Sequence, residues 1–422
     1  MTVRRDAAER RSPLPPLALI AGSIALLLAS CSGGSSDGGR RTSATTTRQS
    51  AELSATTSTV TDRAPERYEG SVDGFYEVPD PLPKGKPGDL IRVQDLGEEG
   101  GVRTVRVMYH SNDAEARDRA VTGIISYPTA EPPEGGWPVT SLANGTVGVA
   151  SQCALSRNGA PATPWGVEGV HAVTDYVGLG PVGEIHPYLS GPSEGNSVID
   201  AVRAARNLPD AHAGKRWFSI GHSQGGHGAL FAGERAAERA PEVDLLGTVS
   251  LAPATELTRT YGPVDEVVAR IVGVMMLYGA SSEHPEIRFE DYAGADLLAA
   301  KDVFEEGCVD DIATTLAPIP AERFYAHDPL ETEPAKSLLQ ENQPGLVASD
   351  APLFLAQGTA DVRVAEQRTR DFFERVCAVG QATDLLIVPG ADHGSIIPAA
   401  APAAAEWMQA RLAGEPAPDS CP

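Results

Sequence analysis

The sequence predicts an α/β fold in which helices cover both faces of a mostly parallel sheet. Two observations favour this class. Short apolar runs typical of strands alternate with longer segments of helical periodicity, and a serine flanked by glycines stands where one such strand passes into a helix. The chain has 422 residues, 41% of them hydrophobic, which is enough to bury a large core. Functional residues are expected at the carboxyl ends of the parallel strands.

The amino terminus has the features of an export signal. Arginines at positions 4, 5, 10 and 11 precede an apolar run of about 14 residues from Leu17 to Ser30, which is too short to span a bilayer. The run closes with Leu28-Ala29-Ser30-Cys31, which resembles a bacterial lipobox. Residues 1–30 are therefore predicted to be a signal peptide and Cys31 to be lipidated. The alternative is an ordinary signal peptide with a chance cysteine.

Residues 31–69 form a predicted flexible linker. The segment is rich in Ser, Thr, Gly and Arg and too poor in apolar residues to bury a core. Together, this segment and Cys31 predict an exported protein, which is either held at the outer face of the bacterial cytoplasmic membrane by an N-terminal lipid or secreted. The formal net charge of −23 would repel phosphate groups, so no nucleic acid is expected as a partner. We expect a monomer.

The core is expected to contain strands and helices in alternation. Two strands alternate polar and apolar side chains in the manner of antiparallel strands, at 102–109 and 120–127. Shorter apolar runs predict further strands at 138–143, 171–174, 217–220, 245–251, 353–357 and 384–388. Helical periodicity appears at 194–207, 228–239, 365–376 and 399–412. This order predicts a parallel sheet with an antiparallel amino-terminal part.

The segment 256–349 breaks the alternation. It lacks a convincing core strand and contains helical patterns, including residues 267–278 and 296–306. We expect a helical cap inserted at this point, with residues 70–255 and 350–422 forming the core. The apolar run 271–278 could line an apolar pocket, although burial inside the cap is the simpler interpretation for each of its residues.

The cysteines agree with export. Of five cysteines, four remain besides Cys31, and an even number in an oxidising compartment predicts disulfides. They are Cys153, Cys308, Cys377 and Cys421. Their spacing leaves all three possible pairings open.

The pattern Gly-x-Ser-x-Gly occurs at three serines, of which one has the right surroundings for catalysis. Ser36 lies in the Ser- and Gly-rich tract, and Ser193 opens a helix without a preceding strand, so Ser193 is interpreted as a turn or N-cap residue. Ser223 lies between a predicted strand and a predicted helix, as in a nucleophile elbow. The glycines at 221 and 225 fit a turn too tight for a Cβ atom.

A nucleophilic serine needs a histidine to accept its proton and a carboxylate to orient that histidine. In folds with this elbow the chain order is serine, acid, histidine. His393 follows the last predicted strand, and Asp361 follows the strand before it. Asp392 is the rival acid, but adjacent side chains tend to point apart. The predicted triad is therefore Ser223, Asp361 and His393.

The reaction also needs hydrogen-bond donors for the oxyanion. The backbone N–H of Gln224 is one candidate, and the loop containing Gly145, Thr146 and Val147 is the other. An ordinary glycine turn is the alternative interpretation of that loop. No metal-binding cluster and no phosphate-binding Gly-x-x-x-x-Gly-Lys pattern occurs, so neither a metal nor another cofactor is expected.

The chain resembles the secretory, lipase A-like lipases. The resemblance spans roughly residues 70–420 and is carried by these segments: Asn144-Gly145-Thr146-Val147-Gly148, Gln152-Cys153-Ala154-Leu155-Ser156, Asp175-Tyr176-Val177-Gly178-Leu179-Gly180, His186-Pro187-Tyr188, Gly221-His222-Ser223-Gln224-Gly225-Gly226 and Gly358-Thr359-Ala360-Asp361. Asn144 and Leu155 depart from the family's usual His and Pro.

The resemblance implies an α/β-hydrolase fold with a helical cap and the triad named above. It implies disulfides between Cys153 and Cys308 and between Cys377 and Cys421. The expected activity is serine carboxylic ester hydrolysis of lipid esters, as in a triacylglycerol lipase. An acyltransferase, or a short-chain or polymer esterase, would use the same triad, and a binding lipoprotein without activity is the alternative from another class.

Overall fold

The computed structural model describes residues 64–163, 165–260 and 267–422. The predicted signal peptide, most of the predicted linker and the lipidation of Cys31 lie outside these ranges. Within them, the helices are either too short or too polar to cross a membrane.

The described residues contain one ten-stranded sheet, with the strand order β1-β2-β3-β4-β6-β5-β7-β8-β9-β10. The neighbours from β2 to β4, and β4 with β6, are antiparallel, whereas every pair from β6 to β10 is parallel. The strands are β1 Glu66–Arg67, β2 Leu90–Glu99, β3 Val102–Asn112, β4 Asp118–Pro128, β5 Trp137–Ala143, β6 Val170–Thr174, β7 Ala213–His222, β8 Asp244–Leu251, β9 Leu353–Gly358 and β10 Thr383–Val388. The predicted α/β class is confirmed.

Strands β1 and β2 were not predicted, and β1 lies inside the predicted linker. The folded part therefore begins before residue 70. Polar residues interrupt the apolar pattern of β2, and their partners come from distant parts of the chain. The guanidinium of Arg92 is buried, donates to the Glu66 carboxylate at 2.8 Å and also binds backbone carbonyls. Sequence periodicity does not detect this strand, because a buried arginine interrupts its apolar pattern.

Helices cover both faces of the sheet. The core helices are α2 Gly191–Arg206, α3 Gln224–Arg239, α11 Glu366–Ala378 and α12 Ile396–Leu412. Side chains along β9 alternate between the two faces: Leu355 packs with Phe372 of α11, whereas Phe354 packs with Trp407 of α12. Both faces of the sheet are thus buried, as continuous apolar strand runs require.

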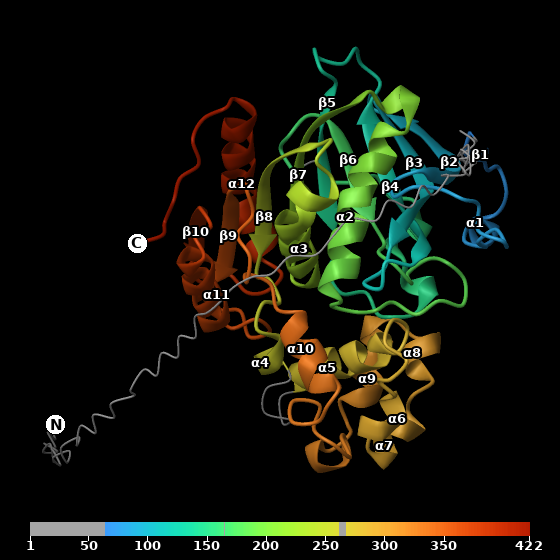
Figure 1. Ribbon diagram of the computed structural model, residues 1–422, viewed down its shortest axis with the longest axis vertical. Helices are drawn as coiled ribbons and strands as arrows, with labels where there is room; N and C mark the ends of the chain where they lie inside the picture. The colour runs from blue at the N-terminus through green and yellow to red at the C-terminus, as the bar shows by residue number, and fades with distance from the viewer. Residues whose placement is uncertain (1–63, 164, 261–266) are drawn as a thin grey trace, which may run out of the picture. The chain divides into compact units, whose positions relative to one another are not determined.

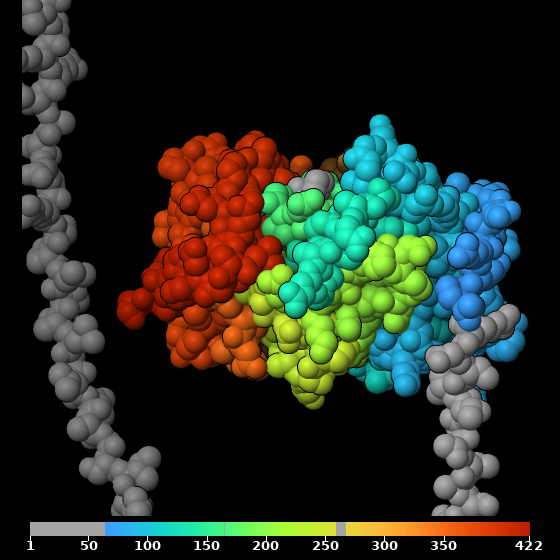
Figure 2. All heavy atoms as spheres, turned by 90° about the horizontal axis from the view of Figure 1, so that it is seen from above, coloured from blue at the N-terminus to red at the C-terminus, as the bar shows by residue number. Residues whose placement is uncertain are grey.

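The segment between β8 and β9 is helical where it is described. It contains α4 Leu257–Thr260, α5 Val267–Ala280, α6 Phe289–Tyr292, α7 Ala295–Ala299, α8 Val303–Glu306, α9 Val309–Leu316 and α10 Ala335–Glu341. Their apolar side chains form one cluster, which also includes Val149, Tyr188 and Leu189 of the core. They gather at one end of the sheet (Figure 1). The opposite end of the molecule is formed by segments that come before β8 or after β9 (Figure 2). The predicted single helix 296–306 is instead α7 and α8, because the chain turns at Ala300, whose N–H bonds to the Leu297 carbonyl.

Two disulfides staple the described chain. Cys153 is bonded to Cys308, 155 residues away, and Cys377 is bonded to Cys421, 44 residues away. These are the pairs implied by the family resemblance. The first joins a loop of the core to the start of α9, and the second joins α11 to the carboxyl terminus.

Candidate active site

Ser223 stands alone between β7 and α3 in a strained backbone conformation. Its φ of 60° and ψ of −120° are rare for a residue with a side chain. A Cβ at Gly221 would lie 1.9 Å from the carbonyl oxygen of Gly225, and one at Gly225 would lie 2.1 Å from that of Ala143. Both glycines are required because the chain approaches itself so closely. This is the geometry of a nucleophile elbow.

Asp361 and His393 meet at the carboxyl ends of β9 and β10. The Nδ1 of His393 lies 2.7 Å from an Asp361 carboxylate oxygen. The other carboxylate oxygen accepts the backbone N–H groups of Arg363 and Val364, at 2.8 and 2.9 Å. Burial alone would raise the pKa of Asp361, but these hydrogen bonds, with that from His393 first, lower it below its ordinary value. An ionised Asp361 binds a protonated Nδ1 and leaves Nε2 of His393 as the free base.

The rival acid, Asp392, is turned away from the histidine ring. Its carboxylate is exposed and accepts hydrogen bonds from the backbone N–H groups of Gly394 and Ser395 and from the Ser395 hydroxyl. Asp392 therefore caps the turn before α12, and of the two candidate acids only Asp361 contacts the His393 side chain in the described structure.

His222 supports the loop of His393. Its Nε2–H donates to the carbonyl oxygen of His393 at 2.7 Å, and the two rings lie 4.5 Å apart between centroids. Burial, followed by the neighbouring His393, lowers the pKa of His222 to about 4. His222 is consequently neutral near pH 7 and adds no second positive charge beside His393.

A cavity of about 650 Å³ opens at Ser223 and His393. Its walls are mostly apolar. The segment between β8 and β9 contributes Val268, Ile271, Val272 and Met275 from α5 and Val309 and Ala313 from α9. Other members of the predicted apolar run, Val274, Met276 and Leu277, pack in the interior of that segment. The run is therefore divided between pocket lining and packing.

The predicted oxyanion loop borders the same cavity. Gly145, Thr146 and Val147 line it next to Ser223. The loop is held from two sides, because the Thr146 hydroxyl lies 2.7 Å from that of Tyr188 and the Val147 carbonyl accepts the N–H of Val309 at 2.9 Å. The side chain of Asn144, one of the two departures from the family pattern, donates to the Thr174 carbonyl at 2.8 Å and so anchors the loop to the sheet.

The structure also brings together polar residues that sequence reasoning did not assign. Glu194, His186 and the side chain of Gln224 form a fully buried hydrogen-bond network beside α3. In the sequence, the one feature that marked this region was the second Gly-x-Ser-x-Gly segment, which contains Glu194. Among the described residues, no group of three or more His, Cys, Asp or Glu side chains is arranged to hold a metal ion.

Comparisons with known proteins agree with this geometry. The family model described as "Secretory lipase" matches residues 166–420. Lipase 10 of Candida albicans is 24% identical over 253 residues, which are 56% of this chain and 54% of that protein. A Mycobacterium tuberculosis protein named "Probable inactive lipase" is 26% identical over 245 residues, 53% of this chain and 52% of that protein. The chain thus spans about half the length of these two curated relatives.

The fold is shared with a solved lipase structure. Candida antarctica lipase A in its closed state superposes with a TM-score of 0.70 at 16% identity, covering 82% of this chain and 87% of that chain. At this identity the likeness establishes the α/β-hydrolase fold alone.

Proposed function

This chain belongs to the secretory lipase family, and on that premise we propose that it hydrolyses carboxylic esters of lipids through an acyl-enzyme on Ser223. One observation carries the proposal. The strained Ser223 and His393, which is hydrogen-bonded to Asp361, border a single apolar cavity. A nucleophile and a base that face one substrate-sized space, with a carboxylate that orients the base, are the requirements of acyl transfer.

In the first half-reaction the Ser223 hydroxyl oxygen attacks the ester carbonyl carbon, and its proton passes to Nε2 of His393. Asp361 stabilises the imidazolium that forms. The Gln224 N–H and an N–H of the 145–147 loop donate hydrogen bonds to the carbonyl oxygen and stabilise its negative charge. When the tetrahedral intermediate collapses, the C–O bond to the alcohol breaks and the alkoxide takes the proton from His393.

In the second half-reaction water attacks the acyl carbonyl of acyl-Ser223 while its proton passes to His393. Collapse releases the carboxylic acid and returns the proton to the Ser223 oxygen. No external oxidant, reductant or cofactor enters this balance.

The lining of the cavity supports a lipid ester as the substrate. Apolar side chains from α5 and α9 form one wall, which suits an acyl chain better than a polar alcohol. Residues 256–349 would act as a cap over Ser223, and α5 would be its acyl-binding element.

Export is the setting that this proposal assumes. Two disulfides and membership of a family described as secretory support an oxidising compartment. Attachment through a lipid on Cys31 would place the enzyme at the outer face of the membrane. Incorporation of labelled palmitate that is lost in Cys31→Ala would support the anchor, and equal incorporation in both proteins would exclude it.

The test of the activity compares the wild type with Ser223→Ala. We expect the wild type to hydrolyse p-nitrophenyl acyl esters and emulsified triacylglycerols and to react with a fluorophosphonate probe, and we expect the variant to do neither. A wild type that is neither labelled nor active would contradict the proposed activity and would favour a protein without catalysis, as the name of one relative states for that relative. Full activity of Ser223→Ala would refute the assignment of the nucleophile.

A further inference from the structure

The second Gly-x-Ser-x-Gly segment, residues 191–195, is the first turn of α2 and packs against α3. Helix α2 begins at Gly191 after the N-cap Ser190, so Ser193 lies inside the helix and is not its N-cap. A Cβ at Gly191 would lie 2.2 Å from the ring of Phe231, and one at Gly195 would lie 2.9 Å from the Ala232 nitrogen. The glycines of this segment therefore permit close helix packing and have no part in an elbow.

The side chain of Glu194 projects from this turn toward the first turn of α3, the helix that follows Ser223. Its side chain is fully buried. One carboxylate oxygen accepts the N–H of Leu189 at 3.0 Å and the side-chain amide of Gln224 at 2.7 Å, and the other lies 2.7 Å from Nδ1 of His227. Three donors satisfy the buried carboxylate, and two of them belong to α3.

The side chain of Gln224 is held in one orientation. Its two amide hydrogens are directed to Glu194 and to Nε2 of His186, 2.8 Å away. His186 uses Nδ1–H to donate to the Val177 carbonyl, and burial lowers the pKa of His186, so Nε2 is an acceptor. A reversed amide would set its oxygen against two acceptors. The contact of 3.7 Å between His186 and Glu194 is therefore not an ion pair.

The network also reaches the end of α10. Nε2 of His227 lies 2.9 Å from the Asn342 carbonyl oxygen, and the side-chain oxygen of Asn342 accepts the N–H of Gly191 at 2.7 Å. Glu194 consequently stands where the first turns of α2 and α3 and the residue after α10 meet.

We propose that Glu194 is a positioning residue for ester hydrolysis, which holds Gln224 so that its backbone N–H is directed at the oxyanion. The inference rests on the proposed function. Gln224 is the first residue of α3 and directly follows the nucleophile. An oxyanion donor is effective only within a narrow range of distance and angle, so a tether on its own side chain governs the barrier of the reaction.

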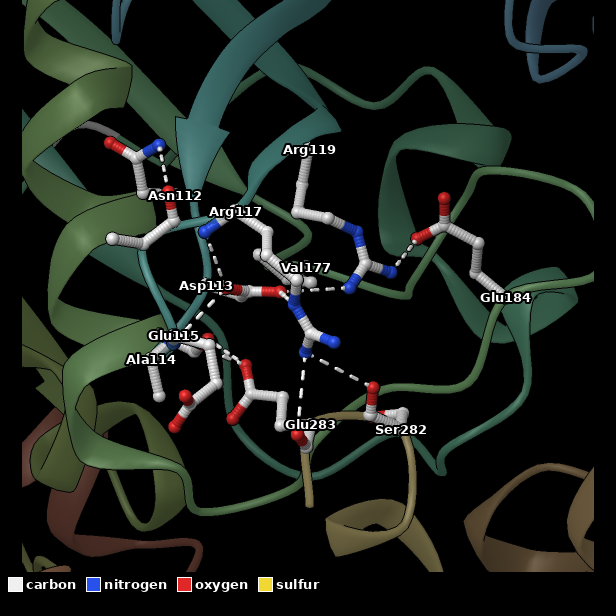
Figure 3. Close-up of polar contacts among 12 residues, drawn as sticks. Asn112, Asp113, Ala114, Glu115, Arg117, Arg119, Val177, Glu184, Ser282 and Glu283 are labelled. Atoms are coloured by element: carbon white, nitrogen blue, oxygen red, sulfur yellow. Dashed lines mark hydrogen bonds and ion pairs between the residues drawn. The ribbon is translucent and has the colours of Figure 1, made fainter. Parts of the chain in front are cut away.

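The test is Glu194→Met, which removes the acceptor for the Gln224 side chain, with Glu283→Met as its matched control. Glu283 is also a buried glutamate whose carboxylate accepts hydrogen bonds from the same turn, through Ser190 and Ser193. It also accepts the N–H of Ala114 at 3.3 Å in the β3–β4 turn (Figure 3), and no hydrogen bond joins its side chain to α3 in the described structure. We expect kcat of Glu194→Met to fall about 10-fold to 100-fold with KM within about 2-fold, and Glu283→Met to stay within about 3-fold of wild type.

Active sites are counted by fluorophosphonate stoichiometry, so kcat refers to folded enzyme only. A merely structural role of Glu194 would lower the number of labelled sites and leave kcat per site unchanged, and that result would overturn the proposal. So would equal kcat losses in the two variants. A wild type that does not label at all would instead contradict the proposed function.

Gln224→Met provides the second arm, because it removes the tether and keeps the backbone N–H. We expect it to lose kcat by a factor similar to that of Glu194→Met, and the double variant to lose no more than either single one. Additive losses would mean that Glu194 does not act through Gln224, and they would refute the inference even if one variant failed to fold well.

Discussion

Replacing Asp361 with Asn should prevent His393 from acting as the catalytic base while keeping a side chain of the same shape at position 361. The backbone N–H groups of Arg363 and Val364 hold one oxygen of the Asp361 side chain, so the oxygen of the introduced amide would stay with them and its nitrogen would face His393. A nitrogen that donates to Nδ1 stabilises the imidazole tautomer whose proton is on Nε2. That tautomer cannot accept the proton of Ser223.

The expected loss is large. Reversal of this tautomer costs a factor of about 10⁴ in kcat in a serine protease with the same hydrogen-bond arrangement, which corresponds to about 5 kcal/mol of transition-state stabilisation. The amide of Gln357, which lies 3.2 Å from the carboxylate oxygen nearest to His393, would then face a second donor and add to the cost.

The assay is hydrolysis of a soluble p-nitrophenyl ester, with thermal unfolding to verify the fold. Asp392→Asn is the matched control, since Asp392 is adjacent to His393 in sequence but exposed and bonded to Ser395. We expect this control to stay within about 3-fold of wild type, as exposed substitutions outside a site generally do. The assignment of the acid would be refuted if Asp361→Asn retained more than about 1% of the wild-type kcat. A larger loss of kcat in Asp392→Asn than in Asp361→Asn would refute it as well.

Three further predictions concern support of the site and stability. His222→Phe should lower kcat about 10-fold because the His393 carbonyl loses its donor, and His222→Gln should restore most of it; equal losses in both would contradict the hydrogen-bond role. Burial lowers the pKa of His171 to about 4, so the unfolded chain binds its proton first as pH falls below about 6.5. The free energy of unfolding should therefore decrease between pH 6.5 and 4, by up to about 3 kcal/mol from this group, and urea titrations of His171→Gln should show a smaller decrease. Replacing Cys153 and Cys308 with Ala should lower the free energy of unfolding by about 2 to 5 kcal/mol, because their bond closes a loop of 155 residues, and a wild-type unfolding midpoint unchanged by reduction would contradict this.

Most of the correct predictions came from short stretches of sequence. The elbow at Ser223 is encoded within a few residues, because a strand, two glycines and a helix in that order leave the backbone few other conformations. The positions of Asp361 and His393 after consecutive parallel strands follow from the same logic, since such strands end at the same edge of the sheet.

Contacts between distant segments were decided by the tertiary structure alone. Glu194 and Gln224 are 30 residues apart, and His227 reaches Asn342 over 115 residues. Strand β1 pairs with β2, where the buried Arg92 binds Glu66. No periodic or local signal shows which of these residues pair with one another, because which buried polar groups meet depends on how two elements pack and on the requirement that each buried group be hydrogen-bonded. The sequence by itself thus determined where Ser223, the proposed nucleophile, stands, and only the packing of α2 against α3 decided which side chains contact its neighbour Gln224.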